Sequence, residues 1–257
     1  MRSVLQHDND GVRVLTLARP ERRNALSAGL VEGLLAALSE ANGDSSVRCI
    51  VLAGSGEAFC AGGDLADGLG GDGALAGHAQ RARYASLLAA MPRCRVPIVA
   101  AVHGVAYGGG LGLVATADLA VADPAAKLGT PEIRLGLFPW IILAALQRGV
   151  PRKALMEMVL TGSSITAERA LALGLINSVS APGEALPAAM SLAQRVGSSS
   201  PAVVAMGKQA FYRIADQGYE DALDYMTSQL SLNLLAEDAA EGVAAFLQKR
   251  PAVWKGR

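Results

Sequence analysis

Two glycine-rich turns are the first features of this sequence that could support chemistry. Residues 59–64 read FCAGGD, and residues 108–113 read GGGLGL after an apolar, strand-like run. Glycines let a ligand approach the main chain, and a glycine run that opens a helix offers free N–H groups at the positive end of the helix dipole. Both turns are therefore candidates for stabilising an anion, although ordinary strand-to-helix turns share this composition.

Glu132 is the candidate for proton transfer. It follows Pro131, which restricts the local backbone, in the stretch GTPE at residues 129–132. Its neighbours in the sequence are apolar, and an apolar environment raises the pKa of a carboxyl group and suits it to general acid–base catalysis. An exposed glutamate, or one paired with Arg134, is the alternative interpretation.

Other polar residues are weaker candidates. His103 is interpreted as a packed residue at a strand end, and Asp118 as a structural residue behind the second turn. The cysteines have neither a CxxC pattern nor metal-ligand spacing, so we expect buried thiols and no metal site. Asp64 is interpreted as a helix cap. The weaker candidates for an additional acid are Asp64, Asp67, Asp72 and Tyr107.

Alternating strands and helices must position these residues, which predicts an α/β fold. Leucines at helical spacing after Ser27 predict a helix that ends near residues 42–44, and another helix is expected around residues 79–91. The glycine-rich residues 68–77 are interpreted as a mobile surface loop or a lid. The expected strands include residues 12–17, 47–52 and 97–102.

The last part of the sequence is helical. Ser200 followed by Pro201 is a typical helix start, and helices are expected over residues 219–235 and 238–249. Both later helices carry long apolar stripes. These stripes favour packing on another subunit over packing on the chain's own core.

The composition excludes several classes of protein. The chain has 257 residues, of which 51% are hydrophobic and 18% are charged, so it is neither disordered nor fibrous. Its 23 basic and 23 acidic residues cancel, which argues against a nucleic-acid-binding protein. No apolar run approaches the roughly 18 residues of a membrane span, and no secretory signal is visible. We therefore expect a cytoplasmic protein with neither nucleic acid nor membrane as a partner.

The two turns and Glu132 together resemble the crotonase superfamily, also called the enoyl-CoA hydratase/isomerase family. Ala61 and Gly109 are 48 residues apart, and Glu132 follows Gly109 by 23 residues. The resemblance extends along nearly the whole chain, including residues 19–27 (RPERRNALS), 156–177 (MEMVLTGSSITAERALALGLIN) and 246–250 (FLQKR). It implies a crotonase-like spiral of ββα repeats over residues 1–200 and a C-terminal helical trimerisation region over residues 201–257.

The resemblance also implies the substrate and the site. An acyl-CoA thioester would place its carbonyl oxygen between the N–H groups of Ala61 and Gly109, and Glu132 would act as the acid and base. No separate cofactor is implied, because coenzyme A is part of the substrate. The quaternary structure implied is a homotrimer or a hexamer of two trimers. Further contacts to substrate or CoA are expected from Arg23, Ala25, Gly62, Gly63, Asp64, Trp140 and Lys249, with Arg22 and Lys255 as additional cations.

The sequence departs from the family pattern at Gly112, where two-carboxylate hydratases have their first glutamate. Adding water needs a proton on one carbon and an activated water on the next, whereas moving a double bond needs a single base, so Gly112 favours isomerisation on chemistry alone. Trp140 would also intrude on the space for water. Hydration of a 2-enoyl-CoA in fatty acid metabolism remains the first prediction, because family members with one glutamate also hydrate. The alternatives are an enoyl-CoA isomerase, a non-catalytic acyl-CoA-binding homologue and, more weakly, an RNA-binding protein.

Overall fold

A computed structural model describes residues 3–64 and 73–257 of the chain. Its larger sheet has the strand order β1-β2-β3-β4-β6-β9, in which β1 and β2 are antiparallel and the other neighbours are parallel. A smaller sheet has the order β5-β7-β8. The larger sheet comprises β1 (Val4–Asn9), β2 (Val12–Leu17), β3 (Cys49–Gly54), β4 (Ile98–Val102), β6 (Leu119–Ala122) and β9 (Ser178–Val179). The smaller comprises β5 (Val105–Tyr107), β7 (Lys127–Gly129) and β8 (Ser164–Thr166).

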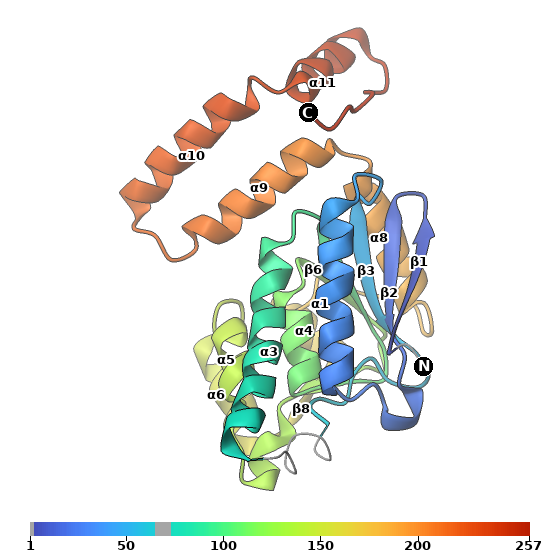
Figure 1. Cartoon of the computed structure of the whole chain (residues 1–257), viewed down its shortest axis with the longest axis vertical. Coiled ribbons are helices and arrows are strands. Elements are labelled where there is room, and N and C mark those ends of the chain that lie inside the picture. Colours follow the sequence, from blue (N-terminus) through green and yellow to red (C-terminus); the bar gives the residue numbers. More distant parts are fainter. Residues whose placement is uncertain (1–2, 65–72) are drawn as a thin grey trace.

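Helices cover both faces of the larger sheet (Figure 1). On one face, α8 (Ala185–Gly197) packs on β3 and β4, while α1 (Ala28–Gly43) and α3 (Ala74–Arg93) lie side by side on the other. Successive parts of the chain repeat a strand–strand–helix order, as in β1-β2-α1 and β4-β5-α4, where α4 is Gly109–Thr116. The remaining elements before residue 200 are η1 (Pro20–Arg22), η2 (Pro131–Leu135), α5 (Trp140–Leu146), α6 (Arg152–Thr161) and α7 (Ala167–Ala172).

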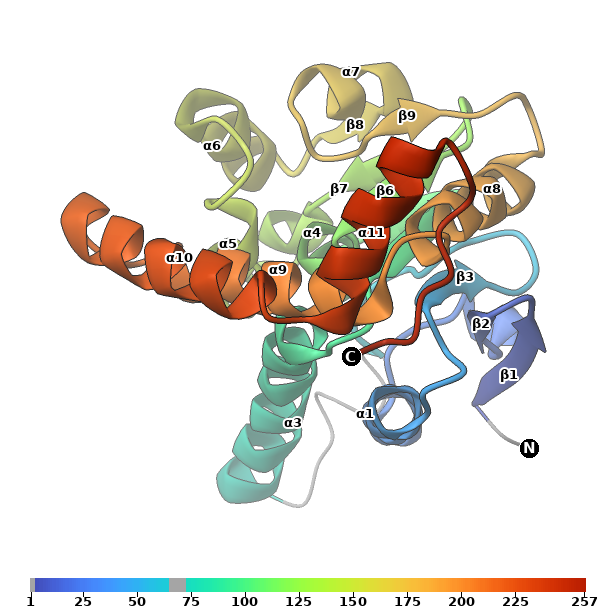
Figure 2. The same cartoon turned by 90° about the horizontal axis from the view of Figure 1, so that it is seen from above.

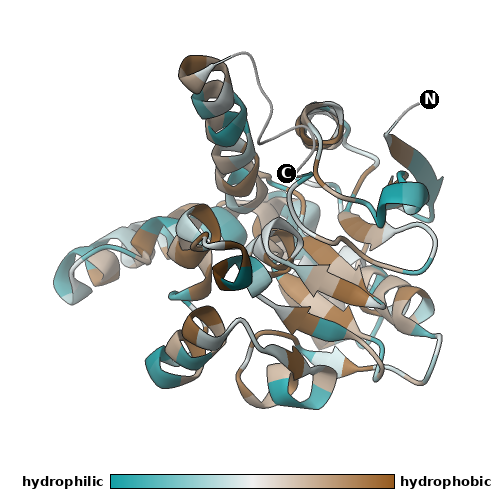
Figure 3. Cartoon of the chain, turned by 90° about the horizontal axis from the view of Figure 1, so that it is seen from below, coloured by the Kyte–Doolittle hydropathy of each residue, from teal (hydrophilic) through white to brown (hydrophobic). Residues whose placement is uncertain are grey.

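The central strands are hydrophobic because both of their faces are covered. Every residue of β4 is buried, as are the first five residues of β3, which is the pattern of parallel strands between two helical layers. Alternate side chains divide between two cores: Val51 and Val99 pack toward α8, whereas Leu52 and Ile98 join the larger core under α1 and α3. Figure 3 shows this concentration of hydrophobic residues on the strands at the centre of the molecule.

Local signals in the sequence predicted several elements correctly. Ser27 caps α1 by accepting a hydrogen bond from the Leu30 N–H at 3.3 Å, and Ser200 caps α9 in the same way. Two boundaries were wrong. The helix expected around residues 79–91 already begins at Ala74, so the C-terminal end of the expected loop 68–77 is helical, and the third strand ends at Gly54 rather than Leu52. Residues 68–72 of that expected loop, with Asp67 and Asp72, lie outside the described residues.

The last three helices, α9 (Pro201–Ile214), α10 (Tyr219–Asn233) and α11 (Glu237–Gln248), gather at one end of the molecule. In both views α10 runs beside α9 and projects from the body of the chain (Figures 1 and 2). Large hydrophobic side chains on α10 and α11 are exposed, including Leu230 and Phe246. The boundary at residues 200 and 201 coincides with the start of α9, and the division into two domains stays a prediction.

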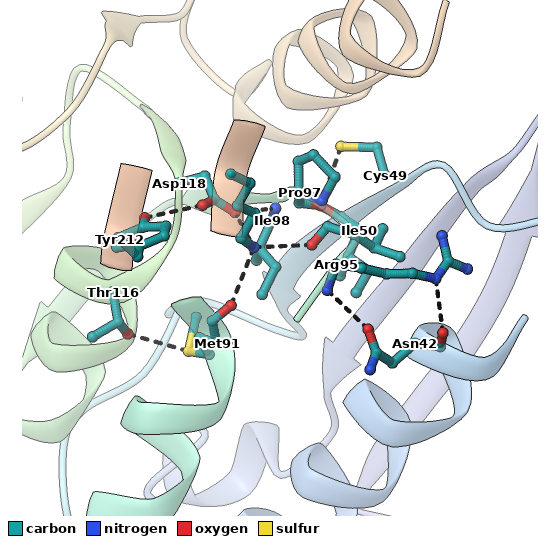
Figure 4. A network of polar contacts seen from close by, with 12 residues as sticks. Asn42, Cys49, Ile50, Met91, Arg95, Pro97, Ile98, Thr116, Asp118 and Tyr212 are labelled. Carbon is teal, nitrogen blue, oxygen red and sulfur yellow. Dashed lines mark hydrogen bonds and ion pairs between the residues drawn. The ribbon is translucent and has the colours of Figure 1, made fainter. Parts of the chain in front are cut away.

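A buried ion pair attaches α9 to the sheet. The Lys208 ammonium donates to Asp118 Oδ2 at 2.7 Å, and the Tyr212 hydroxyl donates to Asp118 Oδ1 at 3.0 Å. Asp118 also accepts the backbone N–H of Ile98, at the start of β4 (Figure 4). Asp118 is therefore a structural residue, as the sequence predicted. Within residues 3–64 and 73–257, no helix is both long and apolar enough to cross a membrane.

Candidate active site

Both glycine turns and Glu132 meet at a cleft of about 370 Å³ beside the N-terminal ends of α1 and α3. In Figure 1 the N-terminal ends of α1 and α3 are at the lower end of the molecule, whereas α10 and α11 are at the upper end. The lining is mostly apolar, with a few convergent polar groups, as expected of a small-molecule site. It is formed by Leu26, Ser27, Ala28, Val31, Gly63, Asp64, Gly77, Gln80, Arg81, Tyr84, Gly109, Glu132 and residues 137–142.

The second glycine turn presents an N–H donor to this cleft. Helix α4 begins at Gly109, so the Gly109 N–H is in its first turn and has no intrahelical acceptor. The preceding Gly108 has a φ of 49°, which side chains other than glycine rarely adopt. The turn is anchored on the smaller sheet, because the Gly108 N–H donates to the Gly129 carbonyl at 3.0 Å. Gly109 therefore lines the cleft at the start of α4, and its predicted role as a donor to the substrate stays a prediction.

The first turn presents Gly63 to the cleft in place of Ala61. The Ala61 N–H already donates to the Arg23 carbonyl at 2.9 Å, and Ala61 is not among the lining residues. Gly63 does line the cleft, and its N–H makes no backbone hydrogen bond with any residue in 3–64 or 73–257. The flanking Gly62 carbonyl and Asp64 N–H are bonded to Leu26, which fixes the orientation of the turn. The donor predicted at Ala61 is thus already occupied, and Gly63 offers the free N–H.

Glu132 is in η2 and carries an orphan oxygen. Its Oε2 atom is buried and has no hydrogen-bond partner among the described residues, and none of the ion pairs found there involves Glu132. Burial raises the pKa of this carboxyl above its usual value. A Cβ atom on Gly108 would lie 2.6 Å from Glu132 Oε1, so the glycine leaves room for the carboxylate. Among the described residues Glu132 therefore forms no salt bridge with Arg134, and its role as an acid or base stays a prediction.

The space beside Gly112 is filled by Tyr84, from α3. The Tyr84 hydroxyl donates to the Gly109 carbonyl at 2.6 Å. A Cβ atom on Gly112 would overlap this hydroxyl and would lie 2.5 Å from Ile142 Cγ2. Burial raises the pKa of Tyr84 well above its usual range, with smaller contributions from Cys60 and Glu132. Sequence reasoning missed Tyr84. The one indirect signal was Gly112, because the missing side chain at that position leaves the space that Tyr84 fills.

Asp64 pairs with a cation of the first loop. Its carboxylate contacts Arg19 Nη1 at 2.9 Å, with side-chain exposures of 9% for Asp64 and 21% for Arg19. The same Arg19 nitrogen donates to the Ala25 carbonyl at 2.8 Å. Asn24 is fully buried and donates to the carbonyl oxygens of two residues in the β3–β4 connection. Asp64 thus links two loops, and its predicted capping role concerns residues outside the described part of the chain.

Trp140 forms a rim of the cleft. It starts α5, is 77% exposed, and packs against the Phe138 ring with centroids 5.0 Å apart. Both rings line the cleft. The predicted intrusion of Trp140 is therefore confined to the mouth of the site, where its ring can contact a bound molecule and remain largely in water.

The predicted CoA cations do not line the cleft within one chain. Arg22 and Arg23 are exposed beside the first turn, and Lys255 pairs with Glu237 at 3.1 Å. Lys249 ends α11, at the opposite end of the molecule from the cleft (Figure 1). Lys249 can reach this site only in a neighbouring copy of the chain. A cation that sequence reasoning missed, Arg81 of α3, does line the cleft.

Several weaker candidates are structural. His103 Nε2 is 3.0 Å from the Gly56 carbonyl at the end of β4, as expected of a packed residue. Cys49, Cys60 and Cys94 are buried free thiols, as predicted. Among the described residues no group of histidine, cysteine and carboxylate side chains is placed to hold a metal ion. A larger cavity of about 730 Å³ lies under α9, but its lining includes neither glycine turn nor Glu132.

The chain matches one family over nearly its whole length. A family model described as "Enoyl-CoA hydratase/isomerase" matches residues 7–257, and the chain belongs to this family. It is 37% identical over 250 residues to "Enoyl-CoA hydratase domain-containing protein 3, mitochondrial" of Mus musculus, covering 95% of this chain and 82% of that protein. The predicted family membership is confirmed.

Solved structures confirm the predicted crotonase-like fold. A crystal structure of enoyl-CoA hydratase from Mycobacterium smegmatis superposes with a TM-score of 0.94 at 39% identity, covering 98% of both chains. The human enoyl Coenzyme A hydratase domain-containing protein 3 superposes with a TM-score of 0.94 at 33% identity, covering 98% of this chain and 100% of that one.

Proposed function

We propose that the protein acts on an unsaturated acyl-CoA thioester and that Glu132 moves the proton. The observation that carries the proposal is the position of the unpartnered, buried Glu132 Oε2 in the same cleft as the Gly109 N–H. In the proposed complex the thioester oxygen accepts hydrogen bonds from the N–H groups of Gly63 and Gly109. The family match and the hydratase names of the relatives support an acyl-CoA substrate.

This arrangement favours the formation of an enolate. Removing a proton from the carbon beside the thioester carbonyl moves an electron pair onto the carbonyl oxygen. Preorganised N–H donors at that oxygen are each worth about 10²–10³ in rate, because they bind the developing charge more strongly than the ground state. The raised pKa of Glu132 brings the carboxylate closer to the working pH of a base that must also return its proton.

Migration of a double bond is the reaction that the geometry supports best. Glu132 would take a proton from carbon 2 of a 3-enoyl-CoA, and the electrons would delocalise into a dienolate. Returning the proton to carbon 4 would give the conjugated 2-enoyl-CoA, so one carboxylate suffices and no co-reactant is needed. The sequence placed hydration first, but Tyr84 and Ile142 fill the space beside Gly112 that a second carboxylate would need.

Hydration is the second candidate, and the names of the relatives favour it. In that reaction the water oxygen bonds to carbon 3 of a 2-enoyl-CoA while a proton reaches carbon 2. Both candidates use the same enolate and the same base. They differ in whether the cleft holds a water molecule beside carbon 3.

Incubation with 2-enoyl-CoA and 3-enoyl-CoA, followed by separation of the products, tests the proposal. Interconversion of the two enoyl thioesters is the expected result. Accumulation of a 3-hydroxyacyl-CoA would establish hydration instead. If neither substrate turns over although both bind, the non-catalytic acyl-CoA-binding alternative replaces the proposal.

Exposed apolar side chains support the predicted homotrimer or hexamer. Leu223, Leu230 and Leu234 of the α10 region and Phe246 and Leu247 of α11 are between 49% and 82% exposed. Covering such a surface with another copy would remove it from water, which favours association. A neighbouring copy could also supply Lys249 to the CoA phosphates. Sedimentation equilibrium measures the mass of the assembly and tests this prediction.

A further inference from the structure

Tyr84 is built into the wall of the cleft by contacts with helix α4. Its hydroxyl donates to the Gly109 carbonyl at 2.6 Å, and a Cβ atom on Gly109 would lie 3.4 Å from the hydroxyl oxygen and from Cζ of the ring. Gly108 and Gly109 have no side chains of their own to restrict the backbone where the proposed N–H donor lies. The phenol therefore adds a side-chain constraint at the Gly109 carbonyl to the backbone hydrogen bond that anchors Gly108.

Tyr84 and Gly112 are also complementary in shape. A Cβ atom on Gly112 would overlap the Tyr84 hydroxyl and press against Ile142. Any larger side chain at position 112 would have to displace the phenol. The space that a carboxylate at position 112 would occupy is therefore not open, because Tyr84 from α3 fills it.

The charged and titratable groups around the phenol keep it neutral. Glu132 faces it from η2, and the Cys60 thiol faces it from the first turn. Burial and these two groups raise its pKa, so the hydroxyl keeps the proton that it donates to the Gly109 carbonyl. Among residues 3–64 and 73–257, the other charged side chains that line the cleft are Arg81, on the helix that carries Tyr84, and Asp64, which is paired with Arg19.

We propose that Tyr84 is a positioning residue of the active site. Its hydroxyl lies in the space beside Gly112 and holds the Gly109 carbonyl. This contact fixes the backbone at Gly109, so that the N–H of the same residue points at the thioester oxygen. The same hydroxyl closes the position that a second carboxylate would need, which leaves Glu132 as the group that transfers protons. This inference rests on the proposed function and names the residue that restricts that site to one base.

Tyr84→Phe tests the role of the hydroxyl, with Tyr212→Phe as the matched control. Each variant removes one buried tyrosine hydrogen bond, but Tyr212 donates to Asp118 far from the cleft lining. We expect kcat of Tyr84→Phe to fall about tenfold, the size of one positioning hydrogen bond, with KM and the acid limb of the pH profile unchanged. Tyr212→Phe should keep the wild-type kcat while its melting temperature falls.

Two results would overturn the inference. If kcat of Tyr84→Phe equals that of the wild type, the hydroxyl positions nothing. If kcat falls by more than about 10³ and the basic limb of the pH profile disappears, Tyr84 itself transfers a proton. The first result leaves the proposed function unchanged, whereas the second keeps the acyl-CoA substrate but adds Tyr84 to Glu132 as a proton-transfer group.

A ligand spectrum provides a second readout that does not require turnover. A 3-oxoacyl-CoA can bind as its enolate, whose oxygen would accept hydrogen bonds from the same two N–H donors. The enolate form is detected by its near-ultraviolet absorbance. We expect the enolate fraction of the bound 3-oxoacyl-CoA to fall about tenfold in Tyr84→Phe and to be unchanged in Tyr212→Phe. Equal enolate fractions in wild type and Tyr84→Phe would contradict the inference even if no enoyl-CoA is turned over.

A double-mutant cycle tests the filled space. Gly112→Ala should lower the melting temperature in the wild-type background, and by a smaller amount in Tyr84→Phe, because the closest clashing atom is then gone. The clash with Ile142 should remain in both. Equal losses in the two backgrounds would show that the hydroxyl does not occupy the space beside Gly112.

Discussion

Two partly buried carboxylates, Asp118 and Glu132, have opposite environments. Asp118 follows the end of α4 and accepts hydrogen bonds from the Lys208 ammonium, the Tyr212 hydroxyl and the Ile98 N–H (Figure 4). Glu132 lies in the cleft near the start of α4, with its buried Oε2 unpartnered among the described residues. A carboxylate that accepts three hydrogen bonds, from α9 and β4, holds those elements together, whereas a carboxylate oxygen without a partner is available to a ligand. The comparison therefore assigns a structural role to Asp118 and leaves Glu132 as the candidate for proton transfer.

The largest effect on stability is expected at the satisfied carboxylate. Asp118→Ala would leave the Lys208 ammonium, whose side chain is only 6% exposed, without its counter-ion. We expect the free energy of unfolding to fall by about 3–5 kcal/mol, measured by urea denaturation. Asp216→Ala, which breaks an exposed pair with Arg148, is the control and should unfold near the wild-type midpoint. Equal losses for the two variants would remove the distinction between the buried and exposed pairs.

A smaller effect is expected where the backbone makes room for the unsatisfied carboxylate. Gly108→Ala adds a methyl group 2.6 Å from Glu132 Oε1 at a φ of 49°. Displacing the carboxylate should lower kcat about 100-fold, because proton transfer depends on its position. Gly149→Ala, which meets no atom within 4 Å, is the matched control. Wild-type kcat in Gly108→Ala would show that the position of Glu132 is not critical.

The raised pKa of Glu132 predicts the pH dependence of activity. The carboxylate form is the base, so kcat/KM should fall as the pH drops through the folded-state pKa, which burial places above 4.5. A pH profile of kcat/KM measures this limb. An acid limb below pH 4.5 would show that the free enzyme stabilises the ionised form of Glu132. That result would contradict the raised pKa and the missing hydrogen-bond partner of Oε2.

The smallest effect is on the stability of a Glu132 variant. Because the folded-state pKa is raised, Glu132 stabilises the fold most below its unfolded-state pKa, and this contribution is lost as the pH rises through the folded-state value. At neutral pH Glu132→Gln should therefore unfold within about 1 kcal/mol of the wild type, on the stabilising side. A loss comparable with that of Asp118→Ala would contradict the contrast between the two carboxylates.

Features set by local sequence were predictable. The caps at Ser27 and Ser200 and the buried run of β4 depend on neighbouring residues, and each was identified from the sequence alone. The raised pKa of Glu132 was also predicted, from its apolar neighbours in the sequence, and in the structure burial is its cause. Asp118 could be identified as structural, although its partners Lys208 and Tyr212 come from a helix 90 or more residues away.

Features that depend on long-range packing were not predictable. Ala61 and Gly63 are two residues apart, and the N–H that faces the cleft is decided by the φ of 103° at Gly62 and by bonds to Leu26 and Arg23. Tyr84 reaches Gly109 from another helix across 25 positions of sequence. Lys249 was predicted as a CoA contact, but it follows α11, which lies at the other end of the molecule from the N-terminal ends of α1 and α3. That position is set by the packing of α9–α11, which local sequence does not reveal.

The most direct test of the central claim is the rate at which Glu132→Gln converts 3-enoyl-CoA to the conjugated thioester. Glu157→Gln, an exposed glutamate of α6, is the matched control. We predict that Glu132→Gln loses at least about 10³ in kcat while it still binds the substrate, and that Glu157→Gln keeps the wild-type rate. Turnover by Glu132→Gln within tenfold of the wild type would show that another group moves the proton.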